Sequence, residues 1–305
     1  MIHGRRTDAV LLLVAIVWGS SYLVAKAATH ALPVSTVLFA RYAISALACL
    51  ALVGAYRRHG RVTRDEMRIG TLLGGTQAAV LLLETYGVAH TSAANAGLII
   101  SLTIVLTPLL DAGRLPPRFF AAAGVCLLAV TLLMAGGGFH RPQAGDLLIL
   151  AAAVIRAVHV VLVGRLTKGR PLRPLQLTAV QMVVGTVLFA GPAASGLPAL
   201  LRADASIWGS LVYLALFCSV FAFLAQTWAV QRSSASRASL LLGTEPVWAV
   251  VIGLGLGGER LTVFAGLGAA LMVIGTYWGQ HIERVHRATP TQSRGPARIA
   301  ASTGE

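Results

Sequence analysis

Six ionisable side chains lie inside long apolar stretches of this sequence, where a charge loses its hydration. They are Lys26, Arg41, Glu84, Arg156, His159 and Glu245. Charged groups buried in a membrane pair with one another or line the path of a substrate or ion. The chemistry suggested by this set is reversible binding of a charged solute or of a proton. Lys26 is the exception, because it lies near the end of its apolar stretch and can extend to the membrane interface.

Glu84 is the first candidate for a binding or coupling role. Gln77 precedes it by seven residues and therefore shares its helical face. Burial favours the neutral form of a carboxylate, which would let Glu84 exchange a proton near neutral pH. The alternative is a structural ion pair with Arg41 or Arg156, and the sequence does not choose between the two.

Arg156 and His159 are three residues apart, on one face of a predicted helix. Together they would bind the carboxylate of a substrate while the other half of the chain supplies Glu84. The alternative is that Arg156 only neutralises a carboxylate. We expect the cavity role.

Glu245 directly precedes Pro246. A proline removes a backbone hydrogen bond and kinks a helix, and a carboxylate beside a kink suits a gate or an ion site. A structural feature that holds the kink is the alternative, and it is slightly favoured.

Aromatic and amide side chains complete the predicted binding set. Aromatic rings bind cationic groups, and amides near the middle of a span prefer the protein interior, although many such residues simply pack. The aromatic candidates for the cavity wall are Trp18, Tyr22, Tyr42 and Trp248, and the amide candidates are Gln181 and Gln226.

Residue patterns typical of catalysis or metal binding are missing from the sequence. There is no H-E-x-x-H motif and no pair of aspartates, and His159 is the one histidine inside a predicted span. Cys49, Cys126 and Cys218 lack metal-ligand spacing. We therefore predict no catalytic residue, no metal site and no cofactor.

The composition requires lipid as the solvent for most of the chain. Of the 305 residues, 56% are hydrophobic and 12% are charged, and the mean hydropathy is +0.75. Soluble domains carry about 25% charged residues. The net charge of +14 lies in short clusters between apolar runs and forms no basic face with interleaved aromatics. The expected partners are the bilayer and a small-molecule substrate, and nucleic acid is excluded.

Ten stretches are long and apolar enough to span a bilayer, which takes about 20 residues. The predicted spans are 8–28, 35–56, 67–88, 94–113, 118–137, 146–165, 174–197, 206–229, 235–257 and 261–280. Arg5 and Arg6 precede the first span, which is too long for a signal peptide and is read as uncleaved. Residues 287–305 are predicted to be a disordered cytoplasmic tail.

The basic residues predict the orientation of these spans. With the N-terminus inside, the inner segments hold 19 Lys and Arg residues and the outer loops hold three. This bias places both termini in the cytoplasm, and it accounts for the positive charge without a polyanionic partner.

An internal repeat divides the chain. Glu84–Leu102 aligns without gaps onto Gln226–Thr244, with an offset of 142 residues, and the match weakens upstream. The predicted domains are 1–138 and 144–280, with five spans each. An odd number of spans makes consecutive repeats enter the membrane from opposite sides, an arrangement typical of transporters with a midplane site. The predicted fold is therefore all-α, with ten transmembrane helices in two inverted five-helix repeats.

Four segments resemble the drug/metabolite transporter superfamily, specifically its members with two EamA-type domains. They are WGSSYLVAKAA from Trp18 with the later LP and FARY, HTSAANAGLIISL from His90, DLLILAAAVIRAVHVVLVGRL from Asp146, and SASRASLLLGTEPVWAVVIGLGLGGERL from Ser234. The last includes the family's terminal Gly-Glu at Gly258 and Glu259. In the first half, Asp111–Arg114 replaces that ending, and Pro108 is displaced by four positions from the place matching Pro246. Arg156 also departs from the family pattern, which has an apolar or aromatic residue there.

The resemblance implies ten helices and export or exchange of amino acids, drugs or other metabolites across a bacterial plasma (inner) membrane. It supplies neither the substrate nor the coupling ion, and proton coupling and oligomeric state remain open. The alternatives are a lipid or isoprenoid-lipid translocase and a membrane protein that transports nothing. A membrane-embedded enzyme or a channel is a weaker alternative, because the sequence lacks the catalytic groups of the one and the selectivity-filter features of the other.

Overall fold

The computed structural model describes residues 2–55, 62–91, 96, 99–111, 115–135, 144–248, 251–252 and 263–288. These residues form helices and turns, and no strand occurs among them. The first half contributes α1 (Ile2–Ala31), α2 (Val34–Ala55), α3 (Arg64–Ala89), α5 (Thr103–Leu110) and α6 (Pro117–Ala135). The second half contributes α7 (Ala144–Thr167), α8 (Pro174–Ala193), η2 (Ala194–Gly196), α9 (Leu197–Leu201), α10 (Ala205–Ala215), η3 (Leu216–Phe221), α11 (Ala222–Arg232), α12 (Ala235–Leu242) and α14 (Val263–Ala288).

Every predicted span overlaps helix in the structure. Six helical stretches of the described chain are long and apolar enough to cross a bilayer, and a seventh apolar stretch, Pro117–Leu132, is shorter. Large apolar side chains such as Leu47 and Leu147, each 70% exposed, point outward, where acyl chains replace water. The chain is an integral membrane protein.

The ends of the chain's predicted segments are only partly described. α14 continues to Ala288, past the predicted end of the last span at 280. The predicted tail beyond residue 288 and the Gly258-Glu259 pair lie outside the described residues, as do residues 112–114.

Local sequence signals start several of the helices. Thr63 caps α3 by accepting a hydrogen bond from the Glu66 amide at 3.2 Å, while Glu66 Oε2 accepts one from the Thr63 amide at 2.8 Å. This reciprocal pair satisfies two backbone donors that a helix start leaves free. Glu66 also accepts two hydrogen bonds from the Arg173 guanidinium, at 2.6 and 2.8 Å, so the cap ties α3 to the start of α8.

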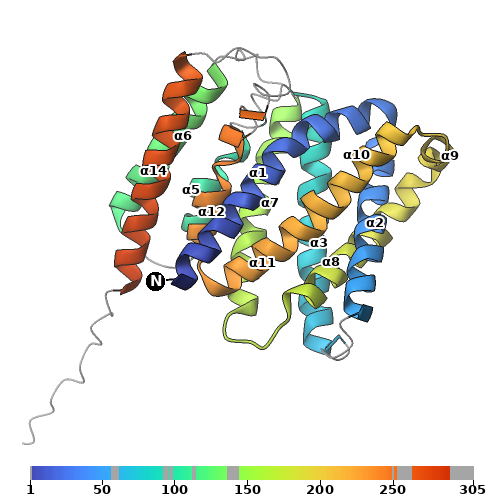
Figure 1. Ribbon diagram of the computed structural model, residues 1–305, viewed down its shortest axis with the longest axis horizontal. Helices are drawn as coiled ribbons and strands as arrows, with labels where there is room; N and C mark the ends of the chain where they lie inside the picture. The colour runs from blue at the N-terminus through green and yellow to red at the C-terminus, as the bar shows by residue number, and fades with distance from the viewer. Residues whose placement is uncertain are drawn as a thin grey trace, which may run out of the picture.

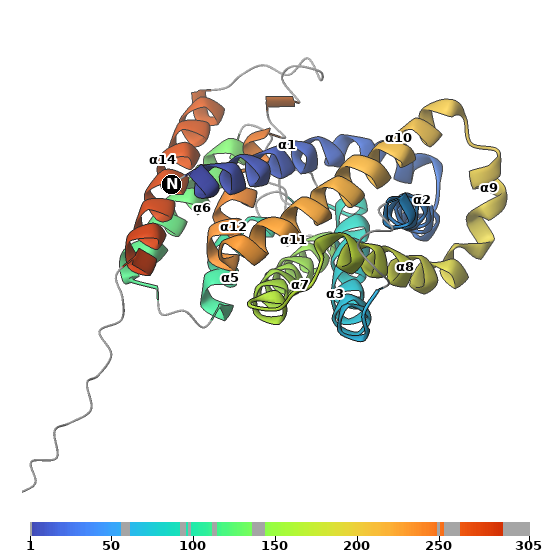
Figure 2. The same ribbon diagram turned by 60° about the horizontal axis from the view of Figure 1, so that its bottom comes forward.

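The helices pack as a main bundle with a separate helix pair at one side. α2 packs along α8, α3 lies against both α7 and α8, and α1 lies along α10, α11 and α12. α6 and α14 pair with each other beside α5 and α12 (Figures 1 and 2). Close approach of α3 to α8 depends on Gly70 and Gly74, where an added Cβ would lie 2.7 and 2.9 Å from the Cβ atoms of Val180 and Val184. Small residues allow such contacts between membrane helices.

Three departures from α-helical geometry occur near the middle of the bundle. η3 is a π-helical segment between α10 and α11. Turns interrupt the helix at Ser101–Leu102 and again at Gly243–Thr244, and these two turns are 142 residues apart, the same offset that relates the repeated segments. α5 packs on α12 at the second turn, since an added Cβ on Gly243 would lie 2.4 Å from Ile104 Cδ1. Irregular backbone at membrane depth is tolerated where it is buried in protein or lines a cavity.

Candidate functional site

A pocket that we call the arginine pocket opens between α1, α2, α3, α7 and α11. About 40 Å³ of it is open to the centre of a water molecule, and one ordered water needs roughly 10–15 Å³ of such space. In the described conformation it therefore has room for only a few waters. Its lining residues are Trp18, Ser21, Tyr22, Ala25, Thr29, Arg41, Leu81, Glu84, Thr85, Val88, Arg156, Phe223 and Glu245.

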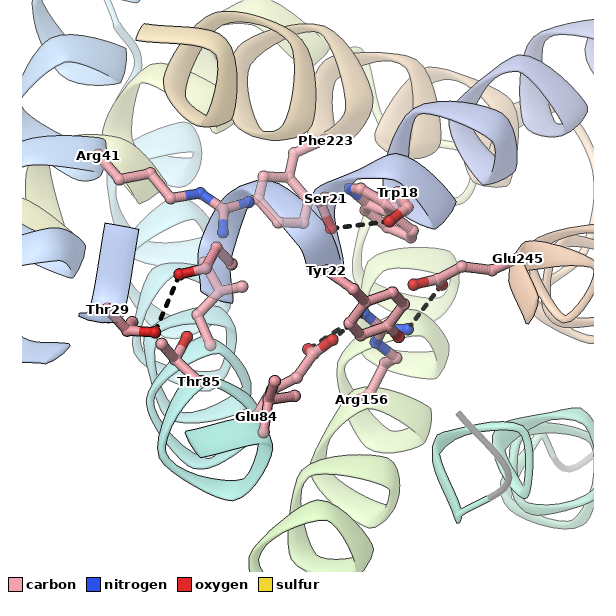
Figure 3. A pocket seen from close by; sticks show the side chains of 13 residues that line it. Trp18, Ser21, Tyr22, Thr29, Arg41, Glu84, Thr85, Arg156, Phe223 and Glu245 are labelled. Carbon is pink, nitrogen blue, oxygen red and sulfur yellow. Dashed lines mark hydrogen bonds and ion pairs between the residues drawn. The ribbon is translucent and has the colours of Figure 1, made fainter. Parts of the chain in front are cut away.

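A charged cluster forms one wall of the arginine pocket. Arg156 on α7 lies 3.2 Å from Glu84 on α3 and 3.2 Å from Glu245 beyond α12 (Figure 3). Its guanidinium carbon also lies 5.0 Å from the centre of the Trp18 ring, within cation–π range. The side chains of Arg156, Glu84 and Glu245 are only 15%, 13% and 4% exposed. Mutual pairing is what makes three buried charges tolerable.

Arg41 on α2 forms the opposite wall. Its Nε donates to Ser219 Oγ at 2.6 Å and its Nη2 donates to the Cys218 carbonyl at 3.1 Å. Both acceptors belong to η3, and the same carbonyl accepts a hydrogen bond from Trp18 Nε1 at 3.0 Å. Within the described chain, no carboxylate lies within ion-pair distance of Arg41, which is 7% exposed.

Tyr22 extends from α1 into the space beside the charged cluster (Figure 3). Its hydroxyl is buried and has no hydrogen-bond partner in the described part of the structure. The charges of Glu245, Glu84 and Arg156 all act on it. The Glu245 carboxylate lies close enough to interact with this hydroxyl, so a ligand or water at this place would share the hydroxyl with Glu245.

A second pocket, here called the helix-break pocket, lies on the other side of the charged cluster. It is smaller, with about 20 Å³ open to the centre of a water molecule. The two helix interruptions contribute Ser101 and Gly243 to its wall. Thr103 and Thr107 of α5 also line it, and the buried Thr107 hydroxyl has no partner among the residues described. Trp18, Arg156 and Glu245 line both pockets. These three side chains, which we call the partition, therefore stand between the two cavities.

The structure brings seven of the twelve predicted site residues to these pockets. The residues that line one or both are Trp18, Tyr22, Arg41, Glu84, Arg156, Gln226 and Glu245. For Glu84 the structural ion pair is present, with Arg156 and not with Arg41. Lys26 is exposed, as expected for a side chain at the interface.

Five predicted site residues line neither pocket. They are Tyr42, Gln77, His159, Gln181 and Trp248.

Three of these five pack within the bundle instead. His159 Nδ1 is hydrogen-bonded to Thr76 Oγ1 at 2.8 Å, so the ring pairs with α3 and not with Arg156. The Tyr42 ring stacks on Phe189 at a centroid distance of 5.6 Å. Gln181 is buried where α8 meets Gly74 of α3. Two residues on the same helical face, such as Arg156 and His159, can therefore contact different neighbouring groups.

Several lining residues were not singled out from the sequence. Ser21 follows Trp18 by three residues and so lies on the same helical face, and Thr85 matches Thr227 in the internal repeat. These signals could have identified both. Phe223, which lines the arginine pocket, and Ser219, which accepts a hydrogen bond from Arg41, belong to an apolar run without any distinguishing pattern. Only the course of η3 and α11 brings them to the site.

The chain is similar to proteins named as transporters. The model of the EamA-like transporter family matches residues 5–136 and again residues 143–278. An uncharacterized inner membrane transporter of Escherichia coli (strain K12), YedA, is 27% identical over 85% of each chain. A probable terminal-alkyne amino-acid exporter of Streptantibioticus cattleyicolor is 26% identical, over 87% of this chain and 90% of its own.

The fold also has a counterpart among solved structures. A crystal structure superimposes with a TM-score of 0.75 and covers 92% of this chain and 98% of its own, at 20% sequence identity. At that identity the likeness concerns the fold alone.

Proposed function

The chain belongs to the EamA-like transporter family, and from this premise we propose that it is a secondary transporter of small charged metabolites that works by alternating access. Ten spans in two inverted five-helix repeats form the path. The protein resides in a bacterial inner membrane with both termini in the cytoplasm. The observation that carries the proposal is the partition of Trp18, Arg156 and Glu245 between two pockets inside a bundle of membrane helices.

The pattern of helix contacts supports the inverted repeat. Corresponding helices of the two halves pair with each other, α2 with α8 and α6 with α14. The predicted fourth spans of the two halves also meet, because α5 packs on α12. The third spans behave alike, since α3 packs on α7 while α10 and α11 pack on α1. The fourth spans do so too, since α5 of the first half packs on α7 while α12 of the second half packs on α1. A pseudo-twofold axis that relates the halves would produce this reciprocity.

The two helix interruptions support a site at the centre of the path. They lie at equivalent positions of the repeats and meet in the helix-break pocket. Discontinuous helices in corresponding positions of two halves are typical of transporter binding sites. Alternating access then consists of widening one pocket at a time while the partition blocks the other.

Amino acids are the first substrate class to test. One relative is named as a probable amino-acid exporter, and the arginine pocket offers both a cation and carboxylates to a ligand that carries both charges.

The decisive experiment is counterflow in proteoliposomes. Liposomes are loaded with one unlabelled amino acid at a time, and uptake of the same labelled amino acid is measured with and without a pH gradient. For at least one amino acid, the labelled compound should accumulate, and its initial rate of uptake should saturate with concentration. Empty liposomes and an Arg156→Gln variant are the controls. Ion conductance without saturable counterflow would instead indicate a channel, and movement of a fluorescent lipid between leaflets would indicate a translocase.

A further inference from the structure

We propose that Arg41 is the residue that binds the anionic group, a carboxylate, of the ligand in the arginine pocket. The proposal rests on the transport function above and names the chemistry that selects its substrate. Arg41 would thus determine specificity, while the partition separates the two pockets.

The distribution of charge is the first reason. The arginine pocket contains two arginines and two carboxylates, yet both Glu84 and Glu245 pair with Arg156. Arg41 has only neutral oxygen atoms as acceptors. A buried cation without a counter-charge is costly, and an anionic ligand removes that cost.

The hydrogen bonds of Arg41 are the second reason. A guanidinium has five N–H donors, and Arg41 uses two of them, on Ser219 and Cys218. The remaining three have no acceptor within the described chain and belong to a group that lines a cavity. A planar guanidinium with free donors is well suited to a carboxylate, which can accept two parallel bonds.

The orientation of Arg41 is fixed before any ligand arrives. Ser219 Oγ donates to the Leu214 carbonyl at 3.1 Å, so its lone pairs are left to accept from Arg41. Ser45 Oγ donates to the Arg41 and Ala215 carbonyls at 2.7 and 3.0 Å, which ties α2 to the end of α10. A group held in its binding geometry loses little entropy when the ligand binds.

The opposite wall has the complementary charge. Across the pocket from Arg41 lies the cluster of Glu84, Arg156 and Glu245 (Figure 3), which carries one more carboxylate than it has cations. Once the pocket widens, a ligand with its carboxylate on Arg41 would place an ammonium group near Glu84. A neutral or purely cationic ligand would leave Arg41 uncompensated.

Acetate and acetamide, which have the same shape and differ in charge, test the anion site directly. Thermal unfolding of the purified full-length protein in detergent is followed with each compound at constant ionic strength, maintained with chloride. Acetate should raise Tm and acetamide should not. Arg41→Gln should lose the acetate shift, and Arg41→Lys should retain a smaller one because lysine cannot bind a carboxylate through a planar fork. Arg202→Gln, at an exposed arginine outside the pocket, is the matched control and should keep the full shift.

Two results would overturn the assignment of Arg41. One is equal Tm shifts from acetate and acetamide in the wild type, and the other is an undiminished acetate shift in Arg41→Gln. If Arg41→Gln does not fold, the alternative experiment is chemical modification of Arg41 in the wild-type protein with phenylglyoxal, measured by mass spectrometry. Acetate should protect Arg41 from the reagent and acetamide should not, and unprotected labelling would also refute the assignment.

Failure of this inference is distinguishable from failure of the transport function. An acetate shift that depends on Arg41, without counterflow of any amino acid, would refute the proposed transport and keep the anion site. Counterflow that continues unchanged in Arg41→Gln would support transport and refute the role of Arg41.

Discussion

At the scale of single residues, the site is a problem of charge balance. One guanidinium, that of Arg156, holds two carboxylates that come from helices far apart in the chain. Removing Arg156 leaves both carboxylates without a partner, whereas removing one carboxylate leaves Arg156 paired with the other. Substitutions at the three positions should therefore differ in their effects on transport and on stability.

Replacing Glu84 by glutamine tests whether this carboxylate couples transport to protons. A coupling role for Glu84 requires that wild-type counterflow varies with pH and that Glu84→Gln loses that variation. The repeat already has Gln226 at the equivalent position, so the amide is compatible with this helix. Asp204→Asn, at an exposed helix cap, serves as the control. An unchanged pH dependence in Glu84→Gln would refute the coupling role.

Replacing Arg156 tests the stabilising role of the cluster. Arg156→Gln leaves two buried carboxylates without a counter-charge and should lower the free energy of unfolding by roughly 3 kcal/mol. The triple variant Glu84→Gln, Arg156→Gln, Glu245→Gln removes all the charges and should recover most of that loss. Unfolding in detergent measures both, and a triple variant less stable than the single one would contradict this account.

At the scale of elements, the helices could largely be predicted and their contacts could not. Apolar length alone placed helices in all ten predicted windows, because lipid imposes a simple rule on composition and span. The proline beside Glu245 correctly indicated an irregular ninth span, although the turn falls at Gly243–Thr244, just before it.

The features that the sequence hid are those decided by packing. η3 has the sequence LFCSVF, with no glycine or proline to indicate a π-helix, yet it holds both Arg41 and Trp18. The sequence suggested Arg156 as one possible partner for Glu84. It did not suggest Glu245 as the third residue of the charged cluster, because Glu245 is 89 residues from Arg156. Partners across helices depend on how the helices cross, and helical periodicity carries no such information.

An ion pair between α1 and α12 offers a test of helix association. Arg237 donates to both carboxylate oxygens of Asp8, at 2.8 and 2.5 Å, and the two side chains are 12% and 19% exposed. Arg237→Asp should lower the free energy of unfolding by about 2 kcal/mol. Adding Asp8→Arg restores the pair with reversed charges and should regain part of this loss in the same unfolding measurement. An additive double variant would mean that the pair does not couple the two helices.

The contact of α2 with α8 depends on one glycine. An added Cβ at Gly185 would lie 2.3 Å from the Tyr42 ring, so Gly185→Ala should force the ring aside and cost about 1–3 kcal/mol. Gly191 lies on the same helix with nothing within 4 Å of such a Cβ, so Gly191→Ala should be tolerated. Comparable Tm values for the two variants would show that the ring moves without cost.

At the scale of the whole molecule, the inverted repeat makes a prediction about sidedness. His90 at the end of α3 and Arg232 at the end of α11 occupy comparable places in the two halves and are both exposed. In a background without the three buried native cysteines, His90→Cys should react with an impermeant maleimide in intact cells. Arg232→Cys should react only after permeabilisation. Labelling of both from the same side would exclude the inversion.

A single oxygen atom, the carbonyl of Cys218, accepts hydrogen bonds from both the Trp18 indole and the Arg41 guanidinium. The indole stands between the two cavities, and the guanidinium reaches toward the incoming solute. Because both depend on the same peptide group, a displacement of that group alters the barrier and the recognition site together. Selectivity and turnover should then respond jointly to mutations of the backbone around residue 218, even where no side chain there meets the solute.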